Sequence, residues 1–132
     1  MIESIYPENW QKTRGSFSPA KKIDIGNIYL VYVSGIQVEK NSENEALTLD
    51  VEEQTENIFE TINSILEEAG ATMNDVVKAQ IFLTDINDFS QVSLIRDKWF
   101  AGSQPVSTLV EVNAMTRKGA KVEIEVTAII KK

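Results

Sequence analysis

Two adjacent hydroxyl residues, Ser107 and Thr108, lie at the start of a predicted strand that follows a predicted helix, the place in this sequence where a functional site is most expected. They begin the run 107–112, whose β-branched and apolar residues predict a strand. Pro105 marks the entry to that strand, because proline cannot donate a hydrogen bond within a sheet. The segment before it has the pattern of a helix end, with Gly102 as a left-handed cap. Side chains of different elements converge where a strand follows a helix, so the sequence predicts a candidate site with two hydroxyls and no charge.

The sequence contains no histidine and no cysteine. Without histidine, the Ser-His-Asp and Cys-His nucleophile systems and the usual imidazole ligands of metal ions are all excluded. Acid–base chemistry is left to carboxylates, lysine, tyrosine or ordered water, and no metal or cofactor is expected. Without cysteine there is no disulfide framework, and the cytoplasm is the expected compartment.

The formal net charge of −7 argues against a nucleic-acid-binding surface. The basic residues are scattered and form only pairs, such as Lys21 and Lys22. The longest nearly apolar stretch runs from Tyr29 to Ile36, which is too short to span a membrane. The first residues lack the basic and apolar regions of a signal peptide. We therefore expect neither nucleic acid nor a membrane as a partner.

Two helices must help to position the candidate site. Asp50 can cap the first of them, and Glu53 completes the reciprocal capping pattern three residues later. Apolar residues then recur at helical spacing until Gly70, which ends the helix. The second helix is expected to be capped by Asn87 or Asp88 and to end near residue 100.

Strands are predicted where apolar or alternating runs occur, whereas residues 1–13 offer little pattern. These runs are 21–25 (an edge strand or a loop leading into one), 29–34, 76–83, 105–112 and 121–130. Gly35 is expected at a bulge or at a close approach of two backbones. In the last strand Glu123 and Glu125 share one face with Lys121, while three apolar residues share the other.

This order of elements predicts one α+β domain over residues 1–132, a mixed sheet with both helices on one face. Strands 29–34 and 76–83 read as apolar on both sides, so a monomer would expose a large apolar sheet. Exposed patches of that kind usually mark subunit interfaces, and we therefore expect an oligomer.

Several strings of residues occur in the order and spacing of a known family, over roughly residues 14–130. They are Phe17-Ser18-Pro19-Ala20, Val33-Ser34-Gly35-Ile36-Gln37, Val51 to Asn57, Leu66 to Gly70, Asp75 to Lys78, Phe82 to Asp85, Trp99-Phe100, Pro105 to Val112 and Val122 to Glu125. On these residues the chain resembles the Rid/YjgF family, reactive intermediate deaminases once labelled translation inhibitors or L-PSP endoribonucleases. The resemblance implies a chorismate-mutase-like (YjgF) fold with a six-stranded sheet. It also implies a homotrimer that holds a small-molecule ligand in a cleft at each subunit interface.

The resemblance further implies which residues form that cleft. Ser34 and Glu123 match the family's cleft serine and the glutamate that positions the attacking water, the two residues expected to be catalytic. Phe17 stands where a tyrosine is usual, and Phe89 matches an aromatic residue that lines the cleft. Ser107 stands where imine-deaminating members have an arginine that holds the substrate carboxylate, a task suited to a planar fork of donors.

Each of these residues has a structural alternative. Ser34 equally fits a small residue at a crowded strand end, and Glu123 an acid paired with Lys121 or Arg117. The two phenylalanines are more often packing residues. Ser107 is more readily a neutral contact than a nucleophile, because no histidine is present to activate it.

Two functions stay open at this point. The first is hydrolysis of a small imine or enamine to a carbonyl compound and ammonia, with a specificity altered by Ser107 and with efficient 2-iminoacid deamination not expected. In it Arg14, Arg96 or Arg117 would have to replace the missing clamp. The second is a trimer that binds a small metabolite without turning it over. Ribonuclease activity is least favoured, because the chain is acidic and has no histidine.

Overall fold

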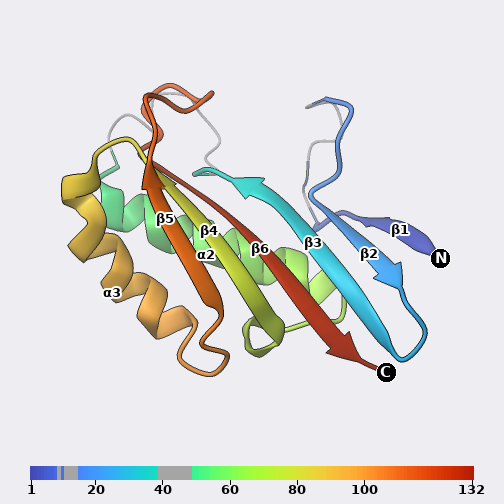
Figure 1. The fold of residues 1–132 in the computed structure, drawn as a ribbon. Coiled ribbons are helices and arrows are strands. Elements are labelled where there is room, and N and C mark those ends of the chain that lie inside the picture. Colours follow the sequence, from blue (N-terminus) through green and yellow to red (C-terminus); the bar gives the residue numbers. More distant parts are fainter. Residues whose placement is uncertain (9, 11–14, 39–48) are drawn as a thin grey trace.

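The computed structural model describes residues 1–8, 10, 15–38 and 49–132. It contains one six-stranded sheet with two α-helices packed on one face (Figure 1). The strands are β1 (Ile2–Ile5), β2 (Ala20–Asp24), β3 (Ile28–Ile36), β4 (Val76–Leu83), β5 (Val106–Glu111) and β6 (Val122–Lys131), and the helices are α2 (Val51–Glu68) and α3 (Phe89–Trp99). Their order in the sheet is β1-β2-β3-β6-β4-β5. Neighbouring strands are antiparallel except for β4 and β5, which are parallel. This is the mixed α+β sheet that the sequence predicts.

Helix α2 begins and ends where its sequence predicts. The Asp50 carboxylate accepts the Glu53 N–H at 2.8 Å, and the Glu53 carboxylate accepts the Asp50 N–H at 3.3 Å. Gly70 follows the last turn with φ 83°, a left-handed conformation that glycine adopts without strain. The apolar side of α2 packs on the sheet, with Ile58, Phe59 and Ile62 fully buried. No helix in the described part of the chain is long and apolar enough to cross a membrane.

Alternation along the strands separates two faces of the sheet. On β4 and β6 the buried residues beneath the helices are Val76, Ala79, Ile81, Leu83, Val122, Ile124, Val126 and Ala128. The residues between them point to the other side, which α2 and α3 do not cover. We call this side the open face; it carries Leu30 and Tyr32 of β3, Glu123, Glu125 and Thr127 of β6, Lys78, Gln80 and Phe82 of β4, and Val106, Thr108 and Val110 of β5. The expectation that strand 76–83 is apolar on both sides is therefore wrong, because Lys78 and Gln80 on its open-face side are polar.

The N-terminal segment and the end of the second helix also differ from the sequence prediction. Residues 2–5 form β1, an edge strand paired with β2, of which only Ile5 is buried. A strand this short and exposed shows no hydrophobic alternation in its sequence. Its strand conformation is instead set by its pairing with β2, which sequence alone does not reveal. After α3 the left-handed residue is Gln104, with φ 46°, and not Gly102. Gly102 instead lies close to Asn74: a Cβ atom there would lie 3.0 Å from the Asn74 amide carbon, so a larger residue would make the Asn74 side chain shift.

Candidate functional site

A β-bulge in β3 creates the candidate site. Val33 pairs with Val126 and Ile36 pairs with Ile124, so β3 contains one residue more than β6 over this interval. The extra residue returns Ile36 to the buried side and leaves Ser34 and Gly35 together on the open face. The Ser34 N–H donates to the carbonyl oxygen of Pro19 at 2.8 Å, which joins the bulge to the segment before β2. The bulge predicted at Gly35 is confirmed.

The carboxylate of Glu123 lies directly on Gly35. A Cβ atom on Gly35 would stand 2.9 Å from the carboxylate carbon and closer still to Oε2, a separation that real Cβ atoms do not show. Gly35 does not have a positive φ, so the position needs glycine for space and not for backbone conformation. The bulge thus makes a seat for one carboxylate on the open face.

Gln37 fixes the Glu123 carboxylate from the other side. Its Nε2 donates to Glu123 Oε1 at 2.8 Å and to Thr116 Oγ1 at 2.9 Å, while its Oε1 accepts the Arg117 N–H at 3.1 Å. The three contacts connect the end of β3, the loop 112–121 and the start of β6. We call Ser34, Gly35, Gln37, Thr116 and Glu123 the Glu123 site. A partly buried carboxylate held in one orientation beside a small hydroxyl residue can accept a proton from water or hold an ammonium group.

Sequence reasoning missed Gln37 and Thr116. Gln37 is separated from Glu123 by 86 positions and from Thr116 by 79. No local pattern joins residues so far apart. The available signal was an amide side chain two residues beyond a strand glycine, which by itself indicates no partner.

The predicted site residues fall into two groups that one chain does not bring together. Ser34 and Glu123 lie at the same end of the open face, and Phe17, which is 52% exposed, lies in the segment that reaches Ser34 through Pro19. Ser107 pairs with Ala79, whose side chain is buried beneath the helices, so Ser107 lies on the helix side of the edge strand β5. Ser107 and Glu123 therefore lie on opposite faces of the sheet.

Thr108 and Phe89 complete the second group. Thr108 pairs with Gln80 and so lies on the open face, but β4 separates it from β6. Two strand spacings put it about 10 Å from the line of β6. Phe89 is the first residue of α3 and is 45% exposed. Thr108 on β5 and the helix α3, which Phe89 begins, both lie closer to the β5 edge of the sheet than the Glu123 site does (Figure 1).

The three arginines considered as replacements for the missing clamp have different positions. Arg14 lies outside the described residues. Arg96 on α3 makes an ion pair with its neighbour Asp97 at 3.1 Å. Arg117 donates its backbone N–H to Gln37, which in turn binds Glu123. Of Arg96 and Arg117, therefore, only Arg117 is linked to Glu123, through its backbone and Gln37.

The two described residues whose pKa values are clearly shifted, Asp24 and Lys132, lie at the opposite end of β6 from Glu123. Lys132 Nζ donates to Asp24 Oδ1 at 2.6 Å, and this hydrogen bond lowers the pKa of Asp24 and raises the pKa of Lys132. The pair fastens the end of β6 to β2 and has no part in the Glu123 site. Among the described residues, no three His, Cys, Asp or Glu side chains come together as potential metal ligands.

Two cavities lie away from the Glu123 site. The larger, of about 520 Å³, lies on the helix side between α2 and α3. The smaller, of about 330 Å³, is lined by the starts of α2 and α3 and by Lys121. None of the predicted site residues lines either cavity.

Comparison with known proteins adds to this geometry. A family model described as endoribonuclease L-PSP matches residues 9–130. A RutC family protein of Pyrococcus abyssi is 38% identical over 127 residues, 96% of this chain and 95% of that protein. The 2-iminobutanoate/2-iminopropanoate deaminase of Mus musculus is 33% identical over 115 residues, 87% of this chain and 82% of that protein. The solved structure of RidA from the Antarctic bacterium Psychrobacter sp. matches with a TM-score of 0.78 at 32% identity, covering 97% of this chain and 99% of that chain.

Proposed function

The chain belongs to the Rid/YjgF family, and from this membership and the geometry of Glu123 we propose that it hydrolyses a small imine or enamine to a carbonyl compound and ammonia. The observation that carries the proposal is the Glu123 carboxylate, held between Gln37 and Gly35 on the open face. A relative of this chain is named for the deamination of 2-iminobutanoate and 2-iminopropanoate.

In the proposed reaction, water adds to the carbon of the C=N bond. The imine reacts in its protonated iminium form, so that when Glu123 takes a proton from the attacking water a neutral carbinolamine results. Glu123 then gives this proton to the nitrogen. The C–N bond breaks, ammonia leaves, and Glu123 takes the hydroxyl proton as the C=O bond forms. Ser34 supplies a hydroxyl beside the same carboxylate to orient the substrate, and the two hydrogen bonds of Gln37 keep Glu123 from rotating away.

We propose that the site is completed between copies of the chain, in a homotrimer that holds the small-molecule ligand at its interfaces. Two observations support this. Ser107 and Glu123 occupy opposite faces of one sheet, so they can contact one ligand only if the second comes from another copy. The open face and β5 also expose Tyr32 by 51% and Val106 by 69%, apolar surface suited to a subunit contact. Light scattering should give a mass three times the 14.8 kDa of one chain, and a monomer mass at micromolar concentration would refute the assembly.

The specificity should differ from that of a 2-iminoacid deaminase. Ser107 offers a neutral hydroxyl where an arginine would hold a carboxylate with two charge-assisted hydrogen bonds. We therefore propose imines with a small or uncharged substituent as the preferred substrates, with Arg117 as the alternative anchor for a carboxylate. The absence of cysteine supports a cytoplasmic location.

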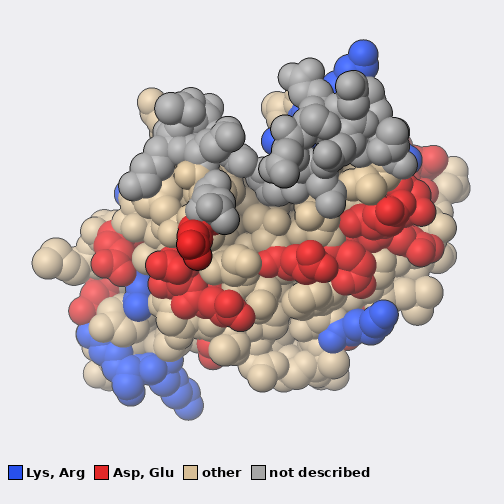
Figure 2. Space-filling model, turned by 180° about the vertical axis from the view of Figure 1, so that it is seen from behind, with Lys and Arg blue, Asp and Glu red and all other residues tan. Residues whose placement is uncertain are grey.

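Two other functions have less support. A non-catalytic metabolite-binding trimer is the alternative, and Ser107 favours it because a main substrate contact of the family is replaced. Ribonuclease activity, which the description of the family model names, is disfavoured by the charge of −7. Figure 2 shows acidic side chains spread across the helix side, where a polyanion would be repelled.

The test is imine hydrolysis with 2-iminoacids and with uncharged imines, generated in the assay by an amino-acid or amine oxidase. Glu123→Gln removes the proton acceptor and should lower the rate by about 100-fold or more, on the order of the contribution of a general base. Glu125→Gln, on the same strand and the same face, is the matched control and should retain the rate. Ser107→Arg should raise the rate with 2-iminoacids by about one to three orders of magnitude.

The outcomes separate the alternatives. If none of the imines is hydrolysed faster than in buffer, while Ser107→Arg is trimeric and equally inactive, the deaminase proposal fails and the binding trimer replaces it. An equal loss of imine-hydrolysing rate in Glu123→Gln and Glu125→Gln would instead show that the rate depends on negative charge on the open face and not on the position of the Glu123 carboxylate.

A further inference from the structure

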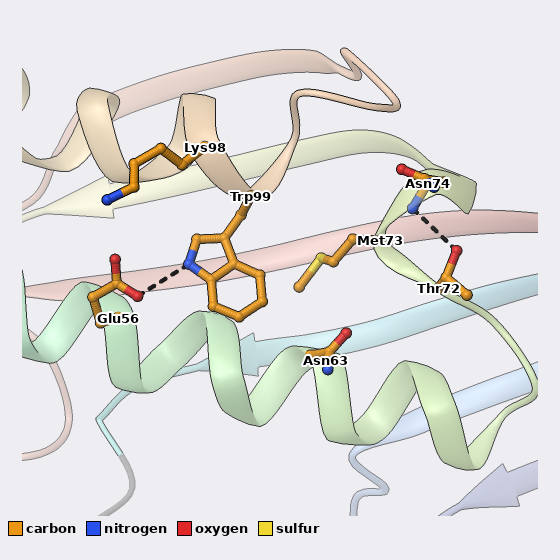
Figure 3. A pocket seen from close by; sticks show the side chains of 7 residues that line it. All are labelled: Glu56, Asn63, Thr72, Met73, Asn74, Lys98 and Trp99. Atoms are coloured by element: carbon orange, nitrogen blue, oxygen red, sulfur yellow. Dashed lines mark hydrogen bonds between the residues drawn. The ribbon is translucent and has the colours of Figure 1, made fainter.

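The larger cavity lies on the helix side of the sheet, away from the Glu123 site (Figure 3). Its volume of about 520 Å³ is within the range of small-ligand sites. Its walls come from α2, from the end of α3 and from the segment 72–74 before β4. Because it opens on the helix side, it stays accessible if the open face is covered by other copies of the chain.

Trp99 gives the cavity a rigid aromatic wall. Its ring stacks on Phe59 with centroids 5.7 Å apart and an angle of 9° between the planes, and Phe100 meets Phe59 edge-on. The indole N–H donates to Glu56 Oε2 at 3.2 Å. Packing on one side and this hydrogen bond on another fix the ring before any ligand arrives, which lowers the entropy cost of binding. Met73 extends the apolar wall away from the indole N–H (Figure 3).

Opposite charges flank the indole at one end of the cavity. Glu56 uses one carboxylate oxygen for Trp99, and its other oxygen, Oε1, has no partner among the residues that the structure describes. The ammonium group of Lys98 likewise has no hydrogen-bond or ion-pair partner in the described ranges. Figure 3 shows both side chains at the indole N–H end, with the apolar surface of Trp99 and Met73 leading away from them. One end of the cavity can therefore take both charges of a zwitterion, and the rest can take an apolar group.

We propose that this cavity binds a free α-amino acid with an aromatic or apolar side chain. The α-ammonium group pairs with Glu56, the α-carboxylate pairs with Lys98, and the side chain lies along Trp99 toward Met73. Helix α2 also carries Glu52, Glu53, Glu60, Glu67 and Glu68, and this negative charge disfavours a purely anionic ligand. This inference does not depend on the deaminase proposal.

The experiment is an NMR titration of the full chain, observing the indole N–H signal of Trp99, whose donor binds Glu56. The probes are L-phenylalanine, 3-phenylpropionate, which lacks the ammonium group, and phenethylamine, which lacks the carboxylate. L-Phenylalanine should shift the signal and bind about tenfold more tightly than either analogue, since each analogue loses one charge-assisted contact. The second tryptophan, Trp10, should not respond.

Two variants assign the contacts. Glu56→Gln keeps an acceptor for the indole but should lose the preference for L-phenylalanine over 3-phenylpropionate. Lys98→Gln should lose the preference over phenethylamine. Glu3→Gln and Lys131→Gln change the charge equally at exposed positions outside the cavity and should keep both preferences.

Three results would overturn the proposal. One is a Trp99 signal that millimolar L-phenylalanine leaves in place. Another is equal affinity for the three probes, which would indicate an aromatic surface without zwitterion recognition. The third is an equal loss of preference in the control variants.

Discussion

Placing a methyl group on Gly35 tests whether the position of one carboxylate governs this protein. In Gly35→Ala the new Cβ atom would stand 2.9 Å from the carboxylate carbon of Glu123, and closer to Oε2. The backbone at Gly35 does not have a positive φ, so alanine introduces no conformational strain there. The carboxylate must therefore move, and it cannot move without weakening the bond from Gln37.

The cost can be estimated from the contacts. A hydrogen bond to a charged group contributes about 1.5–3 kcal/mol, and water can replace part of it at this partly exposed site. We expect Gly35→Ala to lower the free energy of unfolding by about 1.5 kcal/mol. Displacement of a catalytic group by about 1 Å can cost on the order of 100-fold in rate, so imine hydrolysis should fall far more than stability does.

Urea unfolding and the imine assay measure the two effects separately. The control is the same substitution in a Glu123→Ala background, which removes the three atoms that lie nearest to the new methyl group. There Gly35→Ala should change neither rate nor stability by a measurable amount. Gln37→Met releases the carboxylate from the other side and should lower the rate in the same direction. If Gly35→Ala lowers the rate as much without Glu123 as with it, the methyl group disturbs the bulge itself and the reasoning fails.

Three further predictions concern the scaffold. Lys132→Gln should raise the pKa of Asp24 toward its ordinary value, which NMR titration of the carboxyl group measures. Because the pKa of Asp24 is lowered in the native protein, the wild-type protein should be more stable than Lys132→Gln at neutral pH. This difference in stability should disappear as the pH falls through the native pKa. Asp50→Ala should cost about 1 kcal/mol in urea unfolding, whereas Asp50→Asn, which still accepts the Glu53 N–H, should cost less. Gly102→Ala should destabilise the fold through contact with Asn74, and Asn74→Ala should relieve that loss; an unchanged loss in the double variant would contradict the contact.

Much of the fold could be predicted because its signals are local. The reciprocal contacts of Asp50 and Glu53, the helical spacing of α2 and the alternation in β6 all lie within a few residues of one another. The bulge at Gly35 was predictable as well, because a glycine in an otherwise apolar strand has few other roles. Local chemistry determined these elements, and tertiary contacts did not overrule it.

The site itself could be predicted only in part, because its geometry depends on register. Alternation indicates that Ser107 and Leu109 share a face, but only the pairing of Ser107 with Ala79 shows which face that is. The pairing of Glu123 with Phe82 places that carboxylate on the other one. A shift of β5 by a single residue would have reversed the result. Register between strands far apart in the sequence is a tertiary property, and a motif match carries no information about it.

The two faces make the proposed chemistry depend on assembly. A hydroxyl on the helix side of β5 cannot reach a carboxylate on the open face of β6 in the same chain, because the sheet stands between them. A second copy that lays its β5 edge against the first copy's open face removes this barrier. It would also cover the exposed Val106 and Val110. Burial of that apolar surface and completion of the site are then one event, so substitutions that weaken the assembly should lower catalysis even where they touch no substrate. A monomeric variant that kept the full imine-hydrolysing rate would show that Glu123 works without the β5 edge, and Ser107 would then have no part in specificity.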